Sequence, residues 1–412
     1  MRKFTLYSIT LMSIILTCSC TKKHDSHSSD DHQKKVQAAV DSVRLALSEK
    51  IGVDYPYINV IIQTPREKIF VSSAAAGNQP ITADTYYRFA STTKNFTSAA
   101  ILNMYEDGWL NYKEQISHTI PGSKIPYVPN SPEWNFPHKD DITIEQLLQH
   151  SAGVFDVDND TVPGYNGETY TDFVMAQDST HQFSTDEMVN VLTKKHLSYF
   201  NPGKGYHYSN TGYSILAKII ARVYSYKAGK DKTYDDYMQD YIVGGNSPVR
   251  IKEIHFPVLA TDNALPNPHV TGAYLLSTGI QRFDNYNMTA QLGEGNGYGT
   301  MNALNTYIRS LMKGNNALKP STVQLMQTDK SGYDPNYALG CTFRVNLGYG
   351  HNGARIGYLS QMAYDPMNDI SIVSMVTMWD LRNSATSFVL PFNAIYDAAY
   401  AARKALGYPG KP

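Results

Sequence analysis

The stretch FASTTKNFTSAAILNMYEDGWL, residues 89–110, joins a polar start to an apolar run at helical spacing. It predicts a helix that begins at Ser91. The first turn of a helix exposes backbone N–H groups and favours negative charge, so an anion developing at Ser91 would be stabilised there. Lys94 lies three residues later and shares a helix face with Ser91. Serine becomes a nucleophile when a base removes its proton, and a desolvated, neutral lysine is such a base.

The Ser-x-x-Lys spacing alone is a weak signal. It recurs at Ser19–Lys22 and at Ser310–Lys313, where polar residues on a segment surface explain it without any function. A catalytic interpretation of Ser91 and Lys94 therefore needs further polar partners elsewhere in the chain.

Two other short motifs supply such partners. Tyr208-x-Asn210 precedes a helical run in YHYSNTGYSIL, and His351-x-Gly353 lies between predicted strands in YGHNGARIGYLSQM. His207, next to Tyr208, is expected to face the opposite side and to have a rim or packing role. His150 ends a short predicted helix and is interpreted as a structural histidine with satisfied hydrogen bonds.

The remaining periodicity predicts an α+β fold. β-rich runs over 57–64 and 68–77 predict a hairpin near the N-terminus. Further strands are expected near the C-terminus, at 338–345, 357–365 and 369–379. Helices are expected at 34–52, 142–150, 184–196, 211–225, 300–314 and 391–406.

Helix caps and loops complete this outline. Thr143 and Ser184 are predicted to cap their helices, and Glu187 follows Ser184 at the capping-box spacing. Residues 152–182 and 244–300 are expected to be irregular.

These elements predict one antiparallel sheet made from both ends of the chain, with a mainly helical insertion between them. The sheet lobe is expected over 36–88 and 335–405, and the helical lobe over 89–334. A cleft forms readily where two such lobes meet.

Together, the three motifs and their order resemble the serine β-lactamase and penicillin-recognising DD-peptidase superfamily. The resemblance is nearest to its DD-carboxypeptidase, class C β-lactamase and esterase branch. It extends to the blocks around the motifs, such as ITIEQLLQHSAGV and FNPGKGYHYSNTGYSILAKII, and covers roughly residues 36–405.

The resemblance implies that Ser91 attacks a carbonyl and forms an acyl-enzyme that water hydrolyses. It implies that Lys94 and Tyr208 transfer protons, with a neighbouring ammonium lowering the pKa of the Tyr208 phenol. Which of the two takes the first proton is left open. Asn210 is expected to hydrogen-bond Lys94 or a substrate amide.

The third motif contributes the remaining expected site residues. The backbone N–H groups of Ser91 and Ala354 would form the oxyanion hole, and Gly353 would allow close approach of the strand. His351 stands where β-lactamases usually have lysine, and a partly charged histidine anchors a substrate carboxylate more weakly. Asn352 replaces the usual threonine or serine, which weakens the expectation of carboxylate recognition further.

The resemblance favours a D-alanyl-D-alanine carboxypeptidase or related peptidase, acting on a peptidoglycan-type peptide. An esterase, amidase or β-lactamase of the same family is the alternative. A non-catalytic sensor that binds penicillin or cell-wall material is an alternative of another class. No metal or organic cofactor is implied.

The N-terminus predicts export. Residues 1–19 have a basic start and a short apolar run typical of a signal segment, followed by LTCSC. This pattern resembles a lipoprotein signal with Cys20 lipidated, or Cys18 as the alternative, which would anchor the protein at a bacterial cell envelope, on the periplasmic side or the cell surface. Polar residues 20–35 are expected to form a disordered tether, and 36–412 the hydrolase domain.

Composition is consistent with a globular protein that does not bind nucleic acid. The chain has 412 residues, 42% of them hydrophobic, and a formal net charge of −1. Nucleic-acid binding requires a basic face. If Cys18 is removed with the signal and Cys20 is lipidated, Cys341 is the only thiol left, and no internal disulfide is then possible. The sequence does not indicate an oligomeric state.

Overall fold

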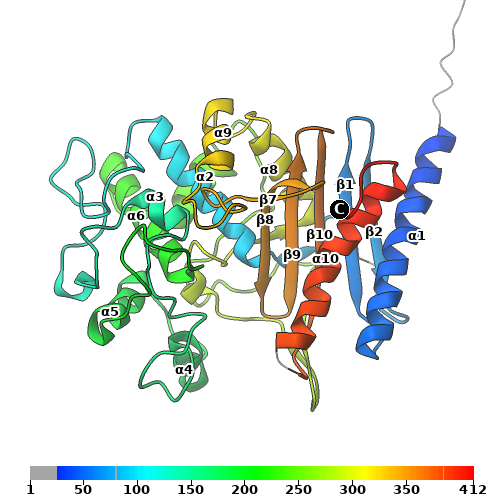
Figure 1. Cartoon of the computed structure of the whole chain (residues 1–412), viewed down its shortest axis with the longest axis horizontal. Helices are drawn as coiled ribbons and strands as arrows, with labels where there is room; N and C mark the ends of the chain where they lie inside the picture. The colour runs from blue at the N-terminus through cyan, green and yellow to red at the C-terminus, as the bar shows by residue number, and fades with distance from the viewer. Residues whose placement is uncertain (1–25, 79–80, 384) are drawn as a thin grey trace, which may run out of the picture.

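The computed structural model describes residues 26–78, 81–383 and 385–412. The signal segment and Cys20 lie outside these residues. The centre of the fold is an antiparallel sheet with the strand order β2-β1-β10-β9-β8-β7, so strands from the two ends of the chain lie side by side (Figure 1). The strands are β1 (Tyr57–Gln63), β2 (Lys68–Ala74), β7 (Thr342–Arg344), β8 (Gly348–Arg355), β9 (Tyr358–Asp365) and β10 (Ile370–Val376).

Alternation along the strands sets the two faces of this sheet, because successive side chains of a strand point to opposite sides. In β1, Ile58, Val60 and Ile62 join one apolar cluster, while Ile61 joins another. The register places Ile61 opposite Val373 of β10. The predicted α+β class and the sheet built from both chain ends are therefore confirmed.

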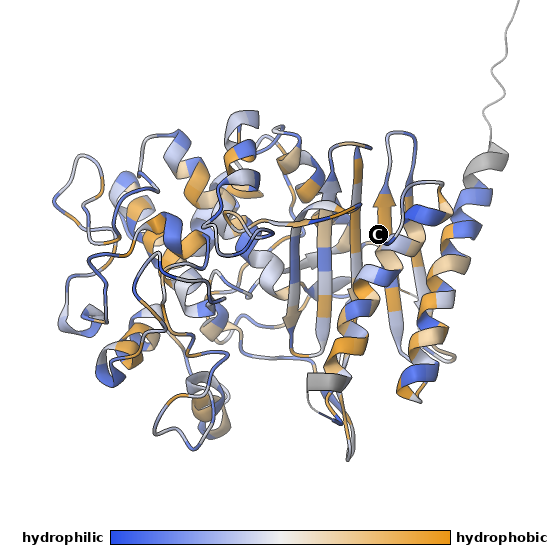
Figure 2. Cartoon of the chain, viewed as in Figure 1, coloured by the Kyte–Doolittle hydropathy of each residue, from blue (hydrophilic) through white to orange (hydrophobic). Residues whose placement is uncertain are grey.

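Two long helices cover one face of the sheet. α1 (Ser26–Ile51) and α10 (Ala385–Ala405) pack against each other and against β1 (Figure 1). In Figure 2 both helices alternate between apolar and polar residues along their length, as expected of helices with one buried side. Within the residues that the structure describes, no helix is both long and apolar enough to cross a membrane.

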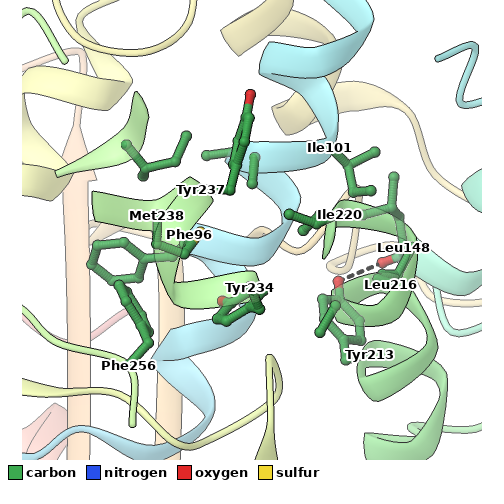
Figure 3. Close-up of a cluster of buried hydrophobic side chains, with 14 of the residues drawn as sticks. Phe96, Ile101, Leu148, Tyr213, Leu216, Ile220, Tyr234, Tyr237, Met238 and Phe256 are labelled. Carbon is green, nitrogen blue, oxygen red and sulfur yellow. Dashed lines mark hydrogen bonds between the residues drawn. The ribbon is translucent and has the colours of Figure 1, made fainter. Parts of the chain in front are cut away.

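The other face meets the helical part of the chain, where aromatic and aliphatic side chains form the larger core (Figure 3). In that core the Tyr213 hydroxyl donates to the Leu148 carbonyl at 2.9 Å. The helices are α2 (Thr93–Glu106), α3 (Ile144–Leu148), α4 (Tyr170–Gln177), α5 (Thr185–Lys195), α6 (Asn210–Ala228), α7 (Tyr234–Tyr237), α8 (Met301–Met312) and α9 (Pro320–Thr328).

Two of these helices begin at the predicted caps. Thr143 forms a capping box with Gln146, and the Ser184 side chain accepts from the Glu187 N–H. Each cap satisfies a backbone donor that the first helical turn leaves free.

The segment 244–300 is more ordered than its composition predicts. It contributes β4 (Gly272–Leu276), β5 (Gly279–Phe283) and β6 (Tyr298–Thr300). β4 pairs with β5 and, in parallel, with β11 (Met378–Asp380), while β6 pairs with β3 (Tyr86–Arg88). These strands form because partners from distant parts of the chain lie beside them, which local composition does not reveal.

The expectation of a disordered tether was wrong for residues 26–35, because these residues belong to α1. Polar contacts, rather than apolar burial, hold this end of the helix. His32 Nδ1 lies 2.7 Å from Glu67 Oε1, and the Gln33 amide donates to the Phe70 carbonyl at 2.8 Å. Both partners lie on or beside the edge strand β2. The polar residues that suggested disorder therefore include those that hydrogen-bond this end of α1 to the edge of the sheet.

Candidate active site

Ser91 lies in a short turn, Ala90–Thr92, between β3 and α2. Ala90 has φ = +52°, a backbone conformation that non-glycine residues rarely adopt. The turn is held through the Phe89 carbonyl, which accepts from the Thr92 hydroxyl at 2.9 Å and from the Ser360 hydroxyl of β9 at 2.8 Å. The predicted helix thus starts two residues later than expected, and Ser91 occupies a constrained turn at its entrance.

Gly353 of β8 packs directly against this turn. A Cβ atom at Gly353 would stand 2.8 Å from the Ser91 nitrogen and closer still to the Phe89 carbonyl oxygen. The expected close approach of the strand is therefore present, and its partner is the turn that carries Ser91. Ala354, the next residue, borders the same cleft as Ser91.

Lys94 is fully buried on the first turn of α2. Its Nζ atom lies 2.6 Å from Asn210 Oδ1, 2.9 Å from the Glu294 carbonyl oxygen and 3.3 Å from Ser91 Oγ. The amide oxygen and the carbonyl can only accept, so they fix two N–H groups of Lys94. The one remaining tetrahedral position is shared between Ser91 Oγ and the Glu294 carboxyl, whose Oε2 lies 3.1 Å away.

The ring of Tyr208 lies beside Lys94, whose Nζ atom is 4.7 Å from the ring centroid. Burial raises the pKa of the Tyr208 phenol well above 10, although a hydrogen bond with Ser91 acts in the opposite direction. The sequence interpretation expected a neighbouring ammonium to lower this pKa. The direction is reversed because removing a phenolate from water is more unfavourable than these contacts are favourable. Tyr208 is therefore a protonated hydroxyl in the free site.

Hydrogen bonds fix the proton positions on two buried histidines. His150 Nδ1 accepts from the Ser209 N–H at 3.1 Å, so its Nε2 carries the proton and donates to the Tyr337 hydroxyl, 3.1 Å away. His351 Nδ1 lies 2.5 Å from the Asn352 carbonyl, which only accepts, so Nδ1 carries the proton. His351 Nε2 then accepts from the Tyr337 hydroxyl at 3.0 Å.

His351 is neutral in this arrangement. Burial, followed by the charge on Lys94, lowers its pKa to about 3. The expected partial charge on His351 is thus absent at neutral pH, because a buried imidazolium would lack an acidic partner. Successive side chains of a strand point to opposite faces of the sheet. Because Gly353 faces the Ser91 turn, the Asn352 side chain points to the other face, although Asn352 also borders the cleft.

The other two histidine expectations agree with the geometry. His150 has a hydrogen-bond partner at each ring nitrogen, and its ring centroid lies 4.2 Å from that of Tyr208. His207 stacks on Tyr199 with centroids 3.6 Å apart and remains partly exposed.

Glu294 is a site residue that the sequence interpretation missed. It is 2% exposed, pairs with Lys94 through Oε2, and its Oε1 atom has no hydrogen-bond partner among the described residues. Burial raises its pKa to about 8, even though the Lys94 charge acts to lower it. No local motif marks this residue, which is 200 positions from Lys94 in the sequence.

Asp158 was missed as well, and it joins four separate segments behind the site. It accepts from the Asn210 amide at 3.0 Å, from the Gln291 amide at 2.8 Å and from the Thr171 hydroxyl at 2.7 Å. It also forms an ion pair with Arg355 of β8 at 3.1 Å. Asp158 thereby positions Asn210, which in turn holds Lys94. The segment 152–182, expected to be an irregular excursion, supplies this residue.

These residues line a cleft of about 730 Å³ between the lobes. Its walls include Ser91, Tyr208, Asn210, Glu294, His351 and Ala354. Within residues 26–78, 81–383 and 385–412, no group of three or more His, Cys, Asp or Glu side chains is placed to hold a metal ion. The site thus combines a serine hydroxyl, an amine and a phenol in one network.

Comparison with known proteins identifies this architecture. The family model described as Beta-lactamase matches residues 58–386. Penicillin-binding protein 4* of Bacillus subtilis (strain 168) is 30% identical over 146 residues, which are 35% of this chain and 26% of that protein. The chain thus matches about a quarter of the length of this relative.

Two solved structures share the fold over nearly their whole length. A D-stereospecific amidohydrolase from Streptomyces sp. has a TM-score of 0.66 at 20% identity, covering 87% of this chain and 98% of that one. D-amino acid amidase from Ochrobactrum anthropi SV3, complexed with D-phenylalanine, has a TM-score of 0.68 at 17% identity, covering 92% and 99%.

Proposed function

The chain belongs to the beta-lactamase family, and we propose that it is a serine hydrolase that cleaves amide and ester bonds through an acyl-enzyme on Ser91. The observation that carries this proposal is the coordination of Lys94. Two of its N–H groups are engaged by Asn210 and the Glu294 carbonyl, and its remaining position is shared between the Glu294 carboxyl at 3.1 Å and Ser91 Oγ at 3.3 Å. A Lys94 that has lost a proton is therefore placed to take the proton of Ser91.

The first half of the reaction follows from this geometry. Lys94 Nζ takes the proton of Ser91 as Oγ attacks the substrate carbonyl. The backbone N–H groups of Ser91 and Ala354 stabilise the negative charge on the carbonyl oxygen. Tyr208, protonated in the free site, donates its hydroxyl proton to the leaving amine or alcohol and recovers a proton from Lys94. Water then cleaves the ester to Ser91 and regenerates the free serine.

We propose amides and short peptides of D-amino acids as the substrate class. Two neighbours in the fold are a D-stereospecific amidohydrolase and a D-amino acid amidase. A neutral His351 provides no charge for a C-terminal carboxylate, which favours an amidase over a carboxypeptidase.

D-alanyl-D-alanine carboxypeptidase activity is the second candidate. The exposed Arg344 of β7 borders the same cleft, and its guanidinium lies over the Tyr396 ring at 3.7 Å. It is a cation within the cleft that a carboxylate could use. A non-catalytic sensor is less consistent with the site, since binding alone does not require Ser91, Lys94 and Tyr208 to share one network.

The test compares the purified full-length chain with Ser91→Ala and Ser310→Ala. Ser310 also precedes a lysine by three residues, but its hydroxyl donates to the Tyr307 carbonyl at 3.1 Å, so it is a matched control. We expect the wild type and Ser310→Ala to release ammonia from D-phenylalaninamide and D-alaninamide, and Ser91→Ala to be inactive with an unchanged melting temperature. Turnover by Ser91→Ala would refute the nucleophile assignment.

A parallel assay with a peptide ending in D-Ala-D-Ala separates the two candidates. Release of D-alanine at a rate above that of the amides would favour the carboxypeptidase. Cleavage of the amides alone would favour the amidase. Mass spectrometry of the intact protein after mixing with an activated ester provides an independent readout, because an acyl group on Ser91 adds a defined mass.

We also propose that the protein is exported and anchored to a cell-envelope membrane through a lipid on Cys20. The support is the sequence of residues 1–20 alone. Cys20→Ala should move the protein from the membrane to the soluble fraction, whereas release by Cys18→Ala and not by Cys20→Ala would assign the lipid to Cys18.

A further inference from the structure

Two aromatic side chains border the cleft on the Arg355 side of Gly353. Beyond Ala354 the cleft is bordered by Arg355 of β8, Trp379 of β11 and Phe388 of α10. These residues come from three elements that meet only in the folded protein. We call Trp379 and Phe388 the aromatic wall.

Trp379 is held in a fixed orientation. Its indole N–H donates to the Tyr358 carbonyl at 3.0 Å. Its ring lies 5.2 Å from Tyr274 of β4 at an interplanar angle of 30°, and Phe388 meets it at 5.0 Å and 74°. Trp379 is nevertheless only partly buried. A half-exposed indole fixed by three neighbours presents a rigid apolar surface to the cleft.

Arg355 does not give this end of the cleft a free positive charge. Both of its terminal nitrogens face Asp158, at 3.1 and 3.3 Å, and its guanidinium lies 5.8 Å from the Tyr286 ring centroid. Because Asp158 neutralises the guanidinium, the surface beside the aromatic wall favours an apolar group over an anion.

The position of Tyr208 indicates which part of a substrate reaches this wall. In the proposed reaction Tyr208 protonates the leaving group, so the leaving group lies on its side of Ser91. Tyr208 contacts Tyr337, whose hydroxyl donates to His351, two residues before Gly353 along β8. Trp379 instead contacts Tyr358, the β9 partner of Arg355, two residues after Gly353. The acyl group must then extend in the opposite direction, past Ala354, toward Trp379.

We propose that the aromatic wall is a subsite for an aromatic or large apolar side chain on the acyl group of the substrate. This inference rests on the proposed function and adds its substrate class: amides or esters of amino acids such as phenylalanine should be preferred over those of alanine. Stacking on the indole and removal of apolar surface from water both favour the larger side chain.

The test measures kcat/KM for D-phenylalaninamide and D-alaninamide with wild type, Trp379→Leu and Phe388→Ala. Trp379→Leu keeps an apolar side chain but removes the aromatic surface. Trp109→Leu is the matched control, because Trp109 packs against Tyr237 and Tyr241 and does not border the cleft. We expect the wild-type ratio of the two kcat/KM values to exceed 1. At least one wall variant should lower this ratio about 10-fold, mainly through the phenylalanine substrate.

Three outcomes separate the subsite from the chemistry. An unchanged ratio in both wall variants, or a wild-type ratio at or below 1, would overturn the subsite. An equal fall for both substrates would show that Trp379 supports the fold rather than specificity, and would also overturn it. If wild type hydrolyses neither amide, the proposed reaction has failed, but calorimetric binding of the two amides to Ser91→Ala still tests the aromatic wall. Tighter binding of the phenylalanine compound that is lost in Ser91→Ala/Trp379→Leu would support the subsite. Equal binding of the two amides would overturn it.

Discussion

Replacing Glu294 with glutamine should change how the stability of the protein depends on pH. The pKa of this carboxyl rises from 4.5 to about 8 because the group is buried, with one oxygen left without a partner among the described residues. Between these two pH values the folded protein keeps a proton on Glu294 that the unfolded chain has released. Folding is therefore coupled to proton uptake at this position.

The sign and size follow from linkage. With one proton more in the folded state, the free energy of unfolding falls by about 1.4 kcal/mol for each pH unit. The contribution is fully present below pH 4.5 and is lost as the pH rises through about 8. Summed over the shift, the loss is about 5 kcal/mol, taking about 1.4 kcal/mol per pKa unit. Glutamine has the shape of the neutral carboxyl and does not titrate, so Glu294→Gln removes this pH dependence.

The assay is urea unfolding of wild type and variant at pH 5, 6, 7 and 8, followed by tryptophan fluorescence. The difference in unfolding free energy, variant minus wild type, should increase by about 1.4 kcal/mol per pH unit. Subtraction cancels every other titrating group that the two proteins share. The exposed Glu168 provides the control, since Glu168→Gln should leave the difference flat. A flat difference for Glu294→Gln would refute the assignment of a buried, protonated carboxyl beside Lys94.

Three further changes test the site. Tyr208→Phe should slow acylation by about 10²–10⁴-fold in stopped-flow assays if the hydroxyl transfers a proton; a near-normal rate would leave Lys94 as the only proton-transfer group. Gly353→Ala should abolish acylation and destabilise the fold by about 1–3 kcal/mol, because its Cβ would stand 2.8 Å from the Ser91 nitrogen. Gly212→Ala, whose nearest contact is 3.6 Å away, is its control, and equal activity of the two variants would contradict the packing argument. Asp158→Ala should cost about 3–5 kcal/mol in chemical unfolding, since it leaves the half-buried Arg355 unpaired. Asp158→Ala/Arg355→Met should recover part of that loss, and if the double variant is less stable than the single one, the ion pair is not the cause.

Local patterns predicted the parts of the fold that local physics determines. The β-rich run 57–64 gives β1, a strand whose inner residues are buried on both faces, under α1 and α10 on one side and in the larger core on the other. Thr143 and Ser184 cap helices because their hydroxyls reach the N–H group three residues later. The polar start of α1 misled the prediction, since a helix fastened by His32 and Gln33 to a sheet edge needs little apolar surface there.

The site was predicted where it rests on motifs and missed where it rests on tertiary contacts. Ser91, Lys94, Tyr208 and Asn210 lie together as their motifs indicate. Glu294 reaches Lys94 only because the segment 244–300 folds over α2, and nothing near it in the sequence specifies that contact. The protonation of a side chain is likewise outside the sequence, because it depends on burial.

The protonation states of the site follow from how few charges burial allows, and His351 shows the consequence. Asp158 stays charged beside Arg355, because a charge removed from water persists only beside an opposite charge, whereas burial raises the pKa of the Glu294 carboxyl beside Lys94 to about 8 and keeps it neutral below that pH. His351 faces the Tyr337 hydroxyl and a carbonyl, and the charge that acts on it most strongly is that of Lys94, which repels a proton. A lysine in its place would bring a second buried cation toward Lys94 without a second acid. A neutral His351 therefore adds no second positive charge beside Lys94. A substrate without a carboxylate at that position needs none.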